Sequence, residues 1–245
     1  MMDKDKIIIQ RDIHCYDIKK RFISRKNEVY LVDVEKTSGQ ILPCVLKKYS
    51  NPNKSKSKEA FLLKVLGQRG LDVPKIYFEG DDYLLLEYID GETFLDVVTN
   101  LEKSQGENIH YTKNYMVLFQ LFKWLQNLQR ITKETLGKSY IFMDINFRNF
   151  ILKDKIYGVD LEDCSCKGYK EIDGGKFCAY LLTYNPSFTP WKKAVIKQAL
   201  DIMTIEFGYN REVLEKEMKR ELSKIQSRRN MEIPINISEV FFPRK

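Results

Sequence analysis

The sequence predicts an α+β fold in which strands and one helix come first and further helices follow. β-type segments and a single helical segment occupy residues 1–88, whereas apolar side chains recur at helical spacing through most of residues 89–245. The pattern changes at Asp90 and Gly91, without a low-complexity linker or an internal repeat. We therefore expect an N-terminal domain over residues 1–88 and a C-terminal domain over residues 89–245.

Local patterns place the elements of the N-terminal domain. Gly39 belongs to a turn signal between two β-rich segments, which is typical of a hairpin. Further along, Leu62 and Leu66 lie at the spacing of one helix face. The predicted elements are strands at residues 30–34, 41–46, 76–78 and 83–86 and a helix at residues 54–69.

The C-terminal domain is predicted to be mainly helical. Its longest helical pattern carries Phe119, Phe122 and Leu125 among its apolar positions. Helices are predicted at residues 93–101, 111–130, 174–182, 191–207 and 211–229, with two short strands at residues 150–152 and 156–159.

Composition excludes several classes of protein. The chain has 245 residues and five cysteines, which is not a disulfide framework and predicts a reduced, cytoplasmic protein. The charged N-terminus predicts no leader, and no apolar run approaches the roughly 20 residues that cross a bilayer, so we expect no membrane partner. The net charge of +7 favours anionic partners. Either a nucleic-acid surface or a solvated face would explain the lysines at positions 47, 48, 54, 56, 58 and 64.

One motif of polar residues indicates a catalytic function. Asp144 is followed five residues later by Asn149 and then by the apolar segment 150–152, and Asp160 follows a second β-type segment. This order resembles the catalytic core of the protein-kinase-like superfamily, where an Asp-x4-Asn loop precedes a second Asp at the end of a strand pair.

Upstream residues extend the resemblance. Lys47 ends Cys44-Val45-Leu46-Lys47, which is similar to the strand lysine motif of the family, and Glu59 lies in the next predicted helix. Residues 85–91 resemble the short hinge that follows a strand. Together these motifs span residues 20 to 182 in the family's order. The resemblance implies a two-lobed fold, with a five-stranded antiparallel sheet and one helix in the N-terminal lobe and ATP and Mg²⁺ bound between the lobes.

The resemblance also implies a role for each nucleotide-binding residue. Lys47 would hold the α- and β-phosphates, and Glu59 would pair with Lys47 and fix its position. The backbone of Glu87 and Ile89 would form hydrogen bonds with the adenine edge.

The remaining residues would act at the metal and at the acceptor. Asn149 and Asp160 would bind Mg²⁺ through hard oxygen ligands. Asp144 would orient the acceptor hydroxyl or accept its proton. Glu162, two residues after Asp160, would at most assist the metal.

Several departures from the usual motifs favour one branch of the protein-kinase-like superfamily. Phe142 replaces the usual histidine two residues before the catalytic aspartate, residues 22–30 contain no glycine, and Leu161-Glu162 replaces Phe-Gly after Asp160. A short segment after Asp160 and the pattern of residues 73–93 look like the aminoglycoside phosphotransferase branch, with its choline-kinase-like and spore-coat-kinase-like members. The same pattern looks equally like the small atypical RIO-like and tRNA-modification kinases, which are the second option, and a nucleotide-binding pseudokinase is a third. Resemblance to the aminoglycoside phosphotransferase branch, the first option, implies transfer of the ATP γ-phosphate to a hydroxyl of a small molecule.

Overall fold

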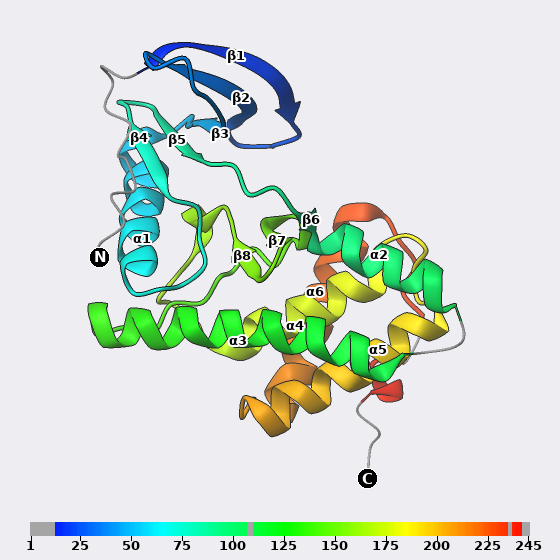
Figure 1. Cartoon of the computed structure of the whole chain (residues 1–245). Coiled ribbons are helices and arrows are strands. Elements are labelled where there is room, and N and C mark those ends of the chain that lie inside the picture. The colour runs from blue at the N-terminus through cyan, green and yellow to red at the C-terminus, as the bar shows by residue number, and fades with distance from the viewer. Residues whose placement is uncertain (1–12, 107–109, 235–236, 242–245) are drawn as a thin grey trace. The chain divides into compact units, whose positions relative to one another are not determined.

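Figure 1 shows the computed structural model of the chain, which describes residues 13–106, 110–234 and 237–241. The fold is α+β, as predicted. The chain forms two compact units: unit 1 comprises Met1–Gly91 and Tyr157–Asp163, and unit 2 comprises Glu92–Ile156 and Cys164–Lys245. The charged residues 1–12, from which the absence of a leader is predicted, lie outside the described residues. The division into kinase lobes at residues 88 and 89 stays a prediction.

Unit 1 contains the predicted five-stranded antiparallel sheet. In space the strands follow the order β1-β2-β3-β5-β4 (Figure 1). Lys47 on the central strand lies opposite Val29 on one side and Leu84 on the other. The strands are β1 (Ile13–Phe22), β2 (Glu28–Lys36), β3 (Ile41–Lys48), β4 (Ile76–Glu79) and β5 (Tyr83–Glu87).

Alternation along the strands gives the sheet a buried face. Val32 and Val34 of β2 are buried with Cys44 of β3 and Leu85 of β5, because side chains two residues apart point to the same face of a strand. Gly39 adopts a φ of 77° in the turn between β2 and β3, a conformation that glycine takes without a steric penalty.

The helix of unit 1 begins with one wide turn. Residues Pro52–Lys56 form a π-helical turn, and α1 follows over Ser57–Gln68. The buried Lys56 donates a hydrogen bond of 2.6 Å to the carbonyl of Gly80, so its side chain fixes this turn against the β4–β5 connection. In α1, Glu59 is buried along with the apolar residues Ala60, Leu62, Leu63 and Leu66.

Unit 2 is mainly helical. Short strands β6 (Glu92–Thr93) and β7 (Phe150–Leu152) pair antiparallel, and β8 (Ile156–Gly158) leads out of the unit. The pattern over residues 191–207 predicts one helix, but its last turns are π-helical over Ile202–Glu206. The α-helices are α2 (Phe94–Gln105), α3 (Tyr111–Leu136), α4 (Lys170–Thr183), α5 (Pro190–Asp201) and α6 (Arg211–Arg229).

Aromatic side chains and close helix packing form the core of unit 2. Several of the aromatic rings contact one another edge to face, which adds to the stabilisation from burial. Gly175 of α4 lies so close to α6 that a Cβ there would come within 2.6 Å of the backbone nitrogen of Met218. The aromatic core includes Phe94, Phe122, Trp124, Phe142, Phe147, Phe150 and Phe177. Among the described residues, none of the helices is long and apolar enough to cross a bilayer.

Candidate functional site

A buried ion pair lies at the centre of unit 1. Lys47 on β3 is 5% exposed and Glu59 on α1 is 1% exposed, and Nζ of Lys47 lies 2.6 Å from Oε2 of Glu59. The Tyr49 hydroxyl donates to the same oxygen over 2.7 Å. Buried charges need partners of this kind, because desolvation without compensation is costly.

The segment after β8 meets this pair. Asp160 has a φ of 65°, and its Oδ1 lies 2.7 Å from Nζ of Lys47. The backbone N–H of Leu161 donates to Oε1 of Glu59 over 3.1 Å. The two oxygens of Glu59 therefore hold Lys47 and the Asp160 segment in one arrangement.

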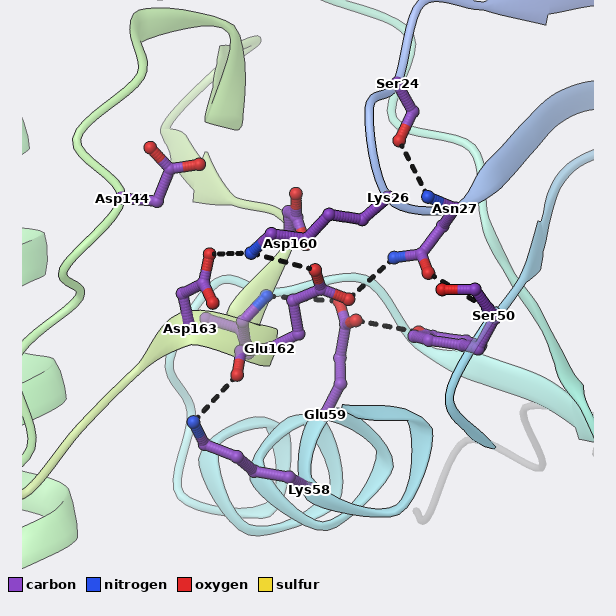
Figure 2. A network of polar contacts seen from close by, with 12 residues as sticks. Ser24, Lys26, Asn27, Ser50, Lys58, Glu59, Asp144, Asp160, Glu162 and Asp163 are labelled. Atoms are coloured by element: carbon purple, nitrogen blue, oxygen red, sulfur yellow. Dashed lines mark hydrogen bonds and ion pairs between the residues drawn. The ribbon is translucent and has the colours of Figure 1, made fainter. Parts of the chain in front are cut away.

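Glu162 completes an acidic group in unit 1. Carboxylate oxygens of Glu59, Asp160 and Glu162 lie within 4.8 Å of one another. Lys58 of α1 donates to the carbonyl of Glu162 over 2.7 Å, which fixes the backbone beside the carboxylates (Figure 2). Hard oxygen donors from several carboxylates are the ligands that Mg²⁺ takes in proteins. The donor set of Glu59, Asp160 and Glu162 therefore fits a divalent cation.

Burial and charge act against each other at the ion pair. Burial lowers the pKa of Lys47, but the carboxylates of Glu59, Asp160 and Glu162 outweigh this effect, so the pKa is raised. Burial raises the pKa of Glu59 although Lys47 and the Tyr49 hydroxyl oppose the change. Lys47 therefore stays a cation at neutral pH.

The glycine-free loop between β1 and β2 reaches the acidic group with side chains. Nζ of Lys26 lies 2.6 Å from Oδ2 of Asp163 and 3.6 Å from Oε1 of Glu162. The Asn27 side chain donates to Oε2 of Glu162 over 2.6 Å, and its backbone N–H donates to the Ser24 hydroxyl (Figure 2). A cation and an amide side chain of this loop thus contact the acidic residues.

Asp144 and Asn149 come together in unit 2. The Asn149 side chain donates to the Asp144 carbonyl over 3.2 Å and to its Oδ2 over 3.1 Å. The loop that carries Asp144 is fixed by Asp173 of α4, which accepts from the backbone N–H groups of Phe142 and Met143 at 2.8 and 2.9 Å. These bonds hold Met143 at a φ of 71°, a left-handed conformation that is uncommon for such a residue.

Phe142 has a packing role at the position where the family usually has histidine. It is fully buried. Its ring centroid lies 5.6 Å from that of Trp124 and 4.8 Å from that of Phe150. The side chain therefore anchors the start of the Asp144 loop by apolar contact.

Of the predicted adenine contacts, Glu87 is the last residue of β5 and Ile89 follows it by two positions in unit 1. The N–H of Glu87 donates to the Lys75 carbonyl over 2.8 Å, and its carboxylate accepts from the Lys75 N–H over 3.2 Å. The side chain of Ile89 is buried. Their role in adenine binding stays a prediction.

No protein-family model matches this sequence, and no curated protein is similar enough to match it. The kinase-like reading therefore depends on the motif resemblance and on the geometry of each unit. Nucleic-acid binding also stays a prediction. Within unit 1, however, several residues of the lysine-rich stretch already have partners: Lys47 with Glu59, Lys56 with Gly80, Lys58 with Glu162 and Lys64 with Glu79.

The structure brings the predicted side chains together in two groups. Lys47, Glu59 and Asp160 lie together in unit 1, while Asp144 and Asn149 lie together in unit 2. The predicted metal ligands Asn149 and Asp160 thus belong to different units. The site residues Tyr49 and Lys58 were missed. Tyr49 follows Lys47 by two positions, directly after the end of β3, and this spacing was the available signal.

Proposed function

We propose that this protein is an ATP- and Mg²⁺-dependent phosphotransferase that moves the γ-phosphate to a hydroxyl of a small molecule. The observation that carries the proposal is the contact of Lys47 with both Glu59 and Asp160. In kinase-like enzymes a strand lysine must be paired with a helix glutamate, and a strand-end aspartate must be in place for the metal. A strand, a helix and a distant loop supply these three side chains here.

The fold of each unit supports the same proposal. The five-stranded antiparallel sheet with α1 agrees with the lobe that the resemblance implies for nucleotide binding. The mainly helical unit 2 presents Asp144 and Asn149 on one loop. The two-lobed kinase-like fold, and membership of the aminoglycoside phosphotransferase branch, are parts of this proposal.

Each group has a defined role in the proposed reaction. The charge of Lys47 neutralises the α- and β-phosphates, and Glu59 positions that ammonium group. Asp160 and Glu162 would hold Mg²⁺, which supplies charge neutralisation on the phosphates when it is bound. The role of Asn149 as a further metal ligand stays a prediction. Asp144 orients the acceptor hydroxyl and accepts its proton. The acceptor oxygen forms a bond to the γ-phosphorus, the bond from that phosphorus to the bridging oxygen breaks, and ADP leaves with that electron pair.

The experiment is a transfer assay with γ-labelled ATP and Mg²⁺ on the full chain. The acceptors are aminoglycosides, amino alcohols, sugars and generic protein substrates, and ATP binding is measured in parallel. Wild type is compared with Lys47→Met, Asp144→Asn and the control Lys48→Met. Lys48 is a neighbouring surface lysine whose ammonium lies 3.6 Å from Asp82.

The two site variants are expected to fail in different ways. Lys47→Met should weaken ATP binding, because the phosphates lose their cation. Asp144→Asn should keep ATP binding and lose about 10²- to 10⁴-fold in kcat, the usual contribution of a general base. Lys48→Met should behave as wild type.

Three results would overturn the proposal or redirect it. Equal ATP affinity in wild type and Lys47→Met would remove the nucleotide site from unit 1. Label on protein substrates alone would favour an atypical protein kinase. ATP binding without transfer to any acceptor, unchanged in Asp144→Asn, would favour a pseudokinase.

A further inference from the structure

Three arginines without an acidic partner surround the Asp144 loop in unit 2. Arg148 lies on the loop itself, and Arg228 and Arg229 form the last turn of α6. All three side chains are exposed. Among the residues that the structure describes, none of the three forms an ion pair with a carboxylate. By contrast, carboxylates pair with four other cations of α6, namely Arg211, Lys219, Arg220 and Lys224.

Tyr184 joins the end of α6 to the loop. Its hydroxyl donates to Oδ1 of Asn146 over 3.2 Å, and Asn146 is two residues from Asp144. The guanidinium of Arg229 lies over the ring of Tyr184, 5.9 Å from the ring centroid. One nitrogen of Arg229 also donates to the Thr183 carbonyl over 3.2 Å. A guanidinium has five N–H donors, so Arg229 is held in place and keeps donors for a ligand.

Tyr180 links the second arginine to the same place. It lies one helical turn before Tyr184 in the chain, and the two ring centroids are 6.4 Å apart. Burial raises the pKa of Tyr180, and the charges of Glu221 and Asp144 raise it further, whereas Arg228 lowers it through a hydrogen bond and its charge. Burial likewise raises the pKa of Tyr184, where Arg148 and Arg229 act against Asp144. Arg228 thus acts on Tyr180, Arg148 and Arg229 act on Tyr184, and Asp144 acts on both phenols.

Lys176 adds a fourth cation beside the loop. This residue of α4 donates a hydrogen bond to the carbonyl of Met143, directly before Asp144. The C-terminal dipole of α6 stabilises cations in its last turn, so Arg228 and Arg229 remain stable there without a carboxylate. Around the loop, the four cations Arg148, Lys176, Arg228 and Arg229 therefore lie with three carboxylates, Asp144, Asp173 and Glu221, of which Glu221 also pairs with Lys224.

We propose that the acceptor of this phosphotransferase carries an anionic group, a carboxylate or a phosphate, which Arg228 and Arg229 bind while Asp144 holds its hydroxyl. This inference rests on the proposed function. Arginine recognises carboxylate and phosphate through paired N–H donors, whereas the same cluster repels cationic acceptors such as aminoglycosides and amino alcohols. In this arrangement Arg228 and Arg229 are binding residues, and Tyr184 is a positioning residue.

The test compares three acceptors that share hydroxyl groups and differ in charge: glycerol, glycerate and glycerol 3-phosphate. Binding of each is measured calorimetrically on the full chain without ATP, and transfer is then measured with γ-labelled ATP and Mg²⁺. Glycerate or glycerol 3-phosphate should bind and accept label at least about tenfold better than glycerol, the effect of one charge-assisted pair. The better of the two identifies the anionic group.

Substitutions of Arg228 and Arg229 test whether these two residues bind the anionic group. Arg229→Gln and the double variant Arg228→Gln/Arg229→Gln should weaken binding of the anionic acceptor, by about tenfold or more for the double variant, and leave glycerol unchanged. The control Lys216→Gln removes one charge from an exposed position of the same helix and should bind the anion as wild type does. Circular dichroism confirms that each variant is folded.

The outcomes separate this inference from the proposed function. Binding of both anions no tighter than glycerol, or unchanged in the double variant, overturns the inference. Anion binding that is lost in Lys47→Met but kept in the double variant overturns it too, because the anion then sits with the residues of unit 1. ATP binding that depends on Lys47, with glycerol the better acceptor, leaves the proposed function standing and removes only the anionic acceptor. No ATP binding, with anion binding that depends on Arg229, overturns the phosphotransferase and the acceptor role together.

Discussion

The hydroxyl of Tyr49 donates a hydrogen bond of 2.7 Å to Oε2 of Glu59 inside the buried part of unit 1. Lys47 donates to the same oxygen, and its ammonium lies 5.0 Å from the centroid of the tyrosine ring. Burial, together with Glu59, raises the pKa of Tyr49, so the phenol stays protonated and remains a donor. Tyr49 therefore restrains the carboxylate that positions Lys47.

Tyr49→Phe removes this donor and leaves the ring. We expect the free energy of unfolding to fall by about 1–2 kcal/mol, since a buried carboxylate loses a hydrogen bond. Urea unfolding of the full chain measures the change. Tyr16→Phe is the control, because Tyr16 is exposed on β1, and it should match wild type. Equal midpoints for the two variants would contradict a stabilising role for the Tyr49 hydroxyl.

Lys26→Met should strengthen binding of a divalent cation by unit 1. In the structure the Lys26 ammonium lies against Asp163 and Glu162, and its hydrogen bond with Asp163 raises the pKa of Lys26, so it competes with a metal as a full charge. Without it, we expect Mn²⁺ to bind about tenfold more tightly, a change of about 1.4 kcal/mol. Titration with Mn²⁺ measures this. Lys19→Met, which disrupts a surface pair with Asp33, is the control, and the same Mn²⁺ affinity in both variants would argue against competition.

The buried carboxyl of Asp173 should make stability depend on pH. Burial raises its pKa to about 6, although the N–H groups of Phe142 and Met143 and the charge of Lys176 lower it. The folded pKa lies above the unfolded value, so the stability that protonation contributes is present below about pH 4 and is lost as the pH rises through about 6. The unfolding free energy of wild type relative to Asp173→Asn should therefore fall by up to about 3 kcal/mol between these limits.

Urea unfolding of both proteins at a series of pH values tests this. Asp201→Asn is the control, since Asp201 is exposed on α5. Parallel pH curves for wild type and Asp173→Asn would show that the carboxyl titrates at its ordinary pKa.

Two helical glycines should respond to alanine in opposite directions. A Cβ at Gly175 would lie 2.6 Å from Cβ of Glu217, whereas a Cβ at Gly67 would lie 3.7 Å from Cγ2 of Val73, an ordinary contact. Gly175→Ala should destabilise unit 2 by about 2 kcal/mol or more, because α4 and α6 must move apart. Gly67→Ala should stabilise α1 by about 0.5–1 kcal/mol through helix propensity. Thermal unfolding measures both, and a stabilising effect of Gly175→Ala would contradict the close packing of α4 and α6.

The elements that bury a regular apolar face could be predicted from the sequence. Alternation of Val32 and Val34 predicts β2, and the spacing of Leu62 and Leu66 predicts α1. β1 could not be located in this way. It is an edge strand of sequence IHCYDIKKRF, in which Tyr16 and Ile18 are exposed, so its residues do not follow the alternation of a half-buried strand.

The residues of the candidate site that belong to sequence motifs could be predicted. The residues that join the site only through long-range side-chain contacts could not. Lys47 and Asp160 are 113 positions apart, and only the family's motif order predicts that they act together. No motif describes Lys26 or Asn27, whose contacts with Glu162 depend on how the loop between β1 and β2 folds.

The short segment Tyr157–Asp163 belongs to unit 1, although the chain on both sides of it belongs to unit 2. Unit 1 is therefore discontinuous in sequence, and a fragment ending at residue 91 would lack both Asp160 and the Leu161 N–H that Glu59 accepts. Such a fragment would contain the residues of the sheet and α1. In it, Lys47 would lack its contact with Asp160, and Glu59 would lack the hydrogen bond from Leu161. The two units consequently cannot be separated by one proteolytic cut or exchanged between proteins as intact modules, because the chain passes from unit 1 to unit 2, back to unit 1 and again to unit 2.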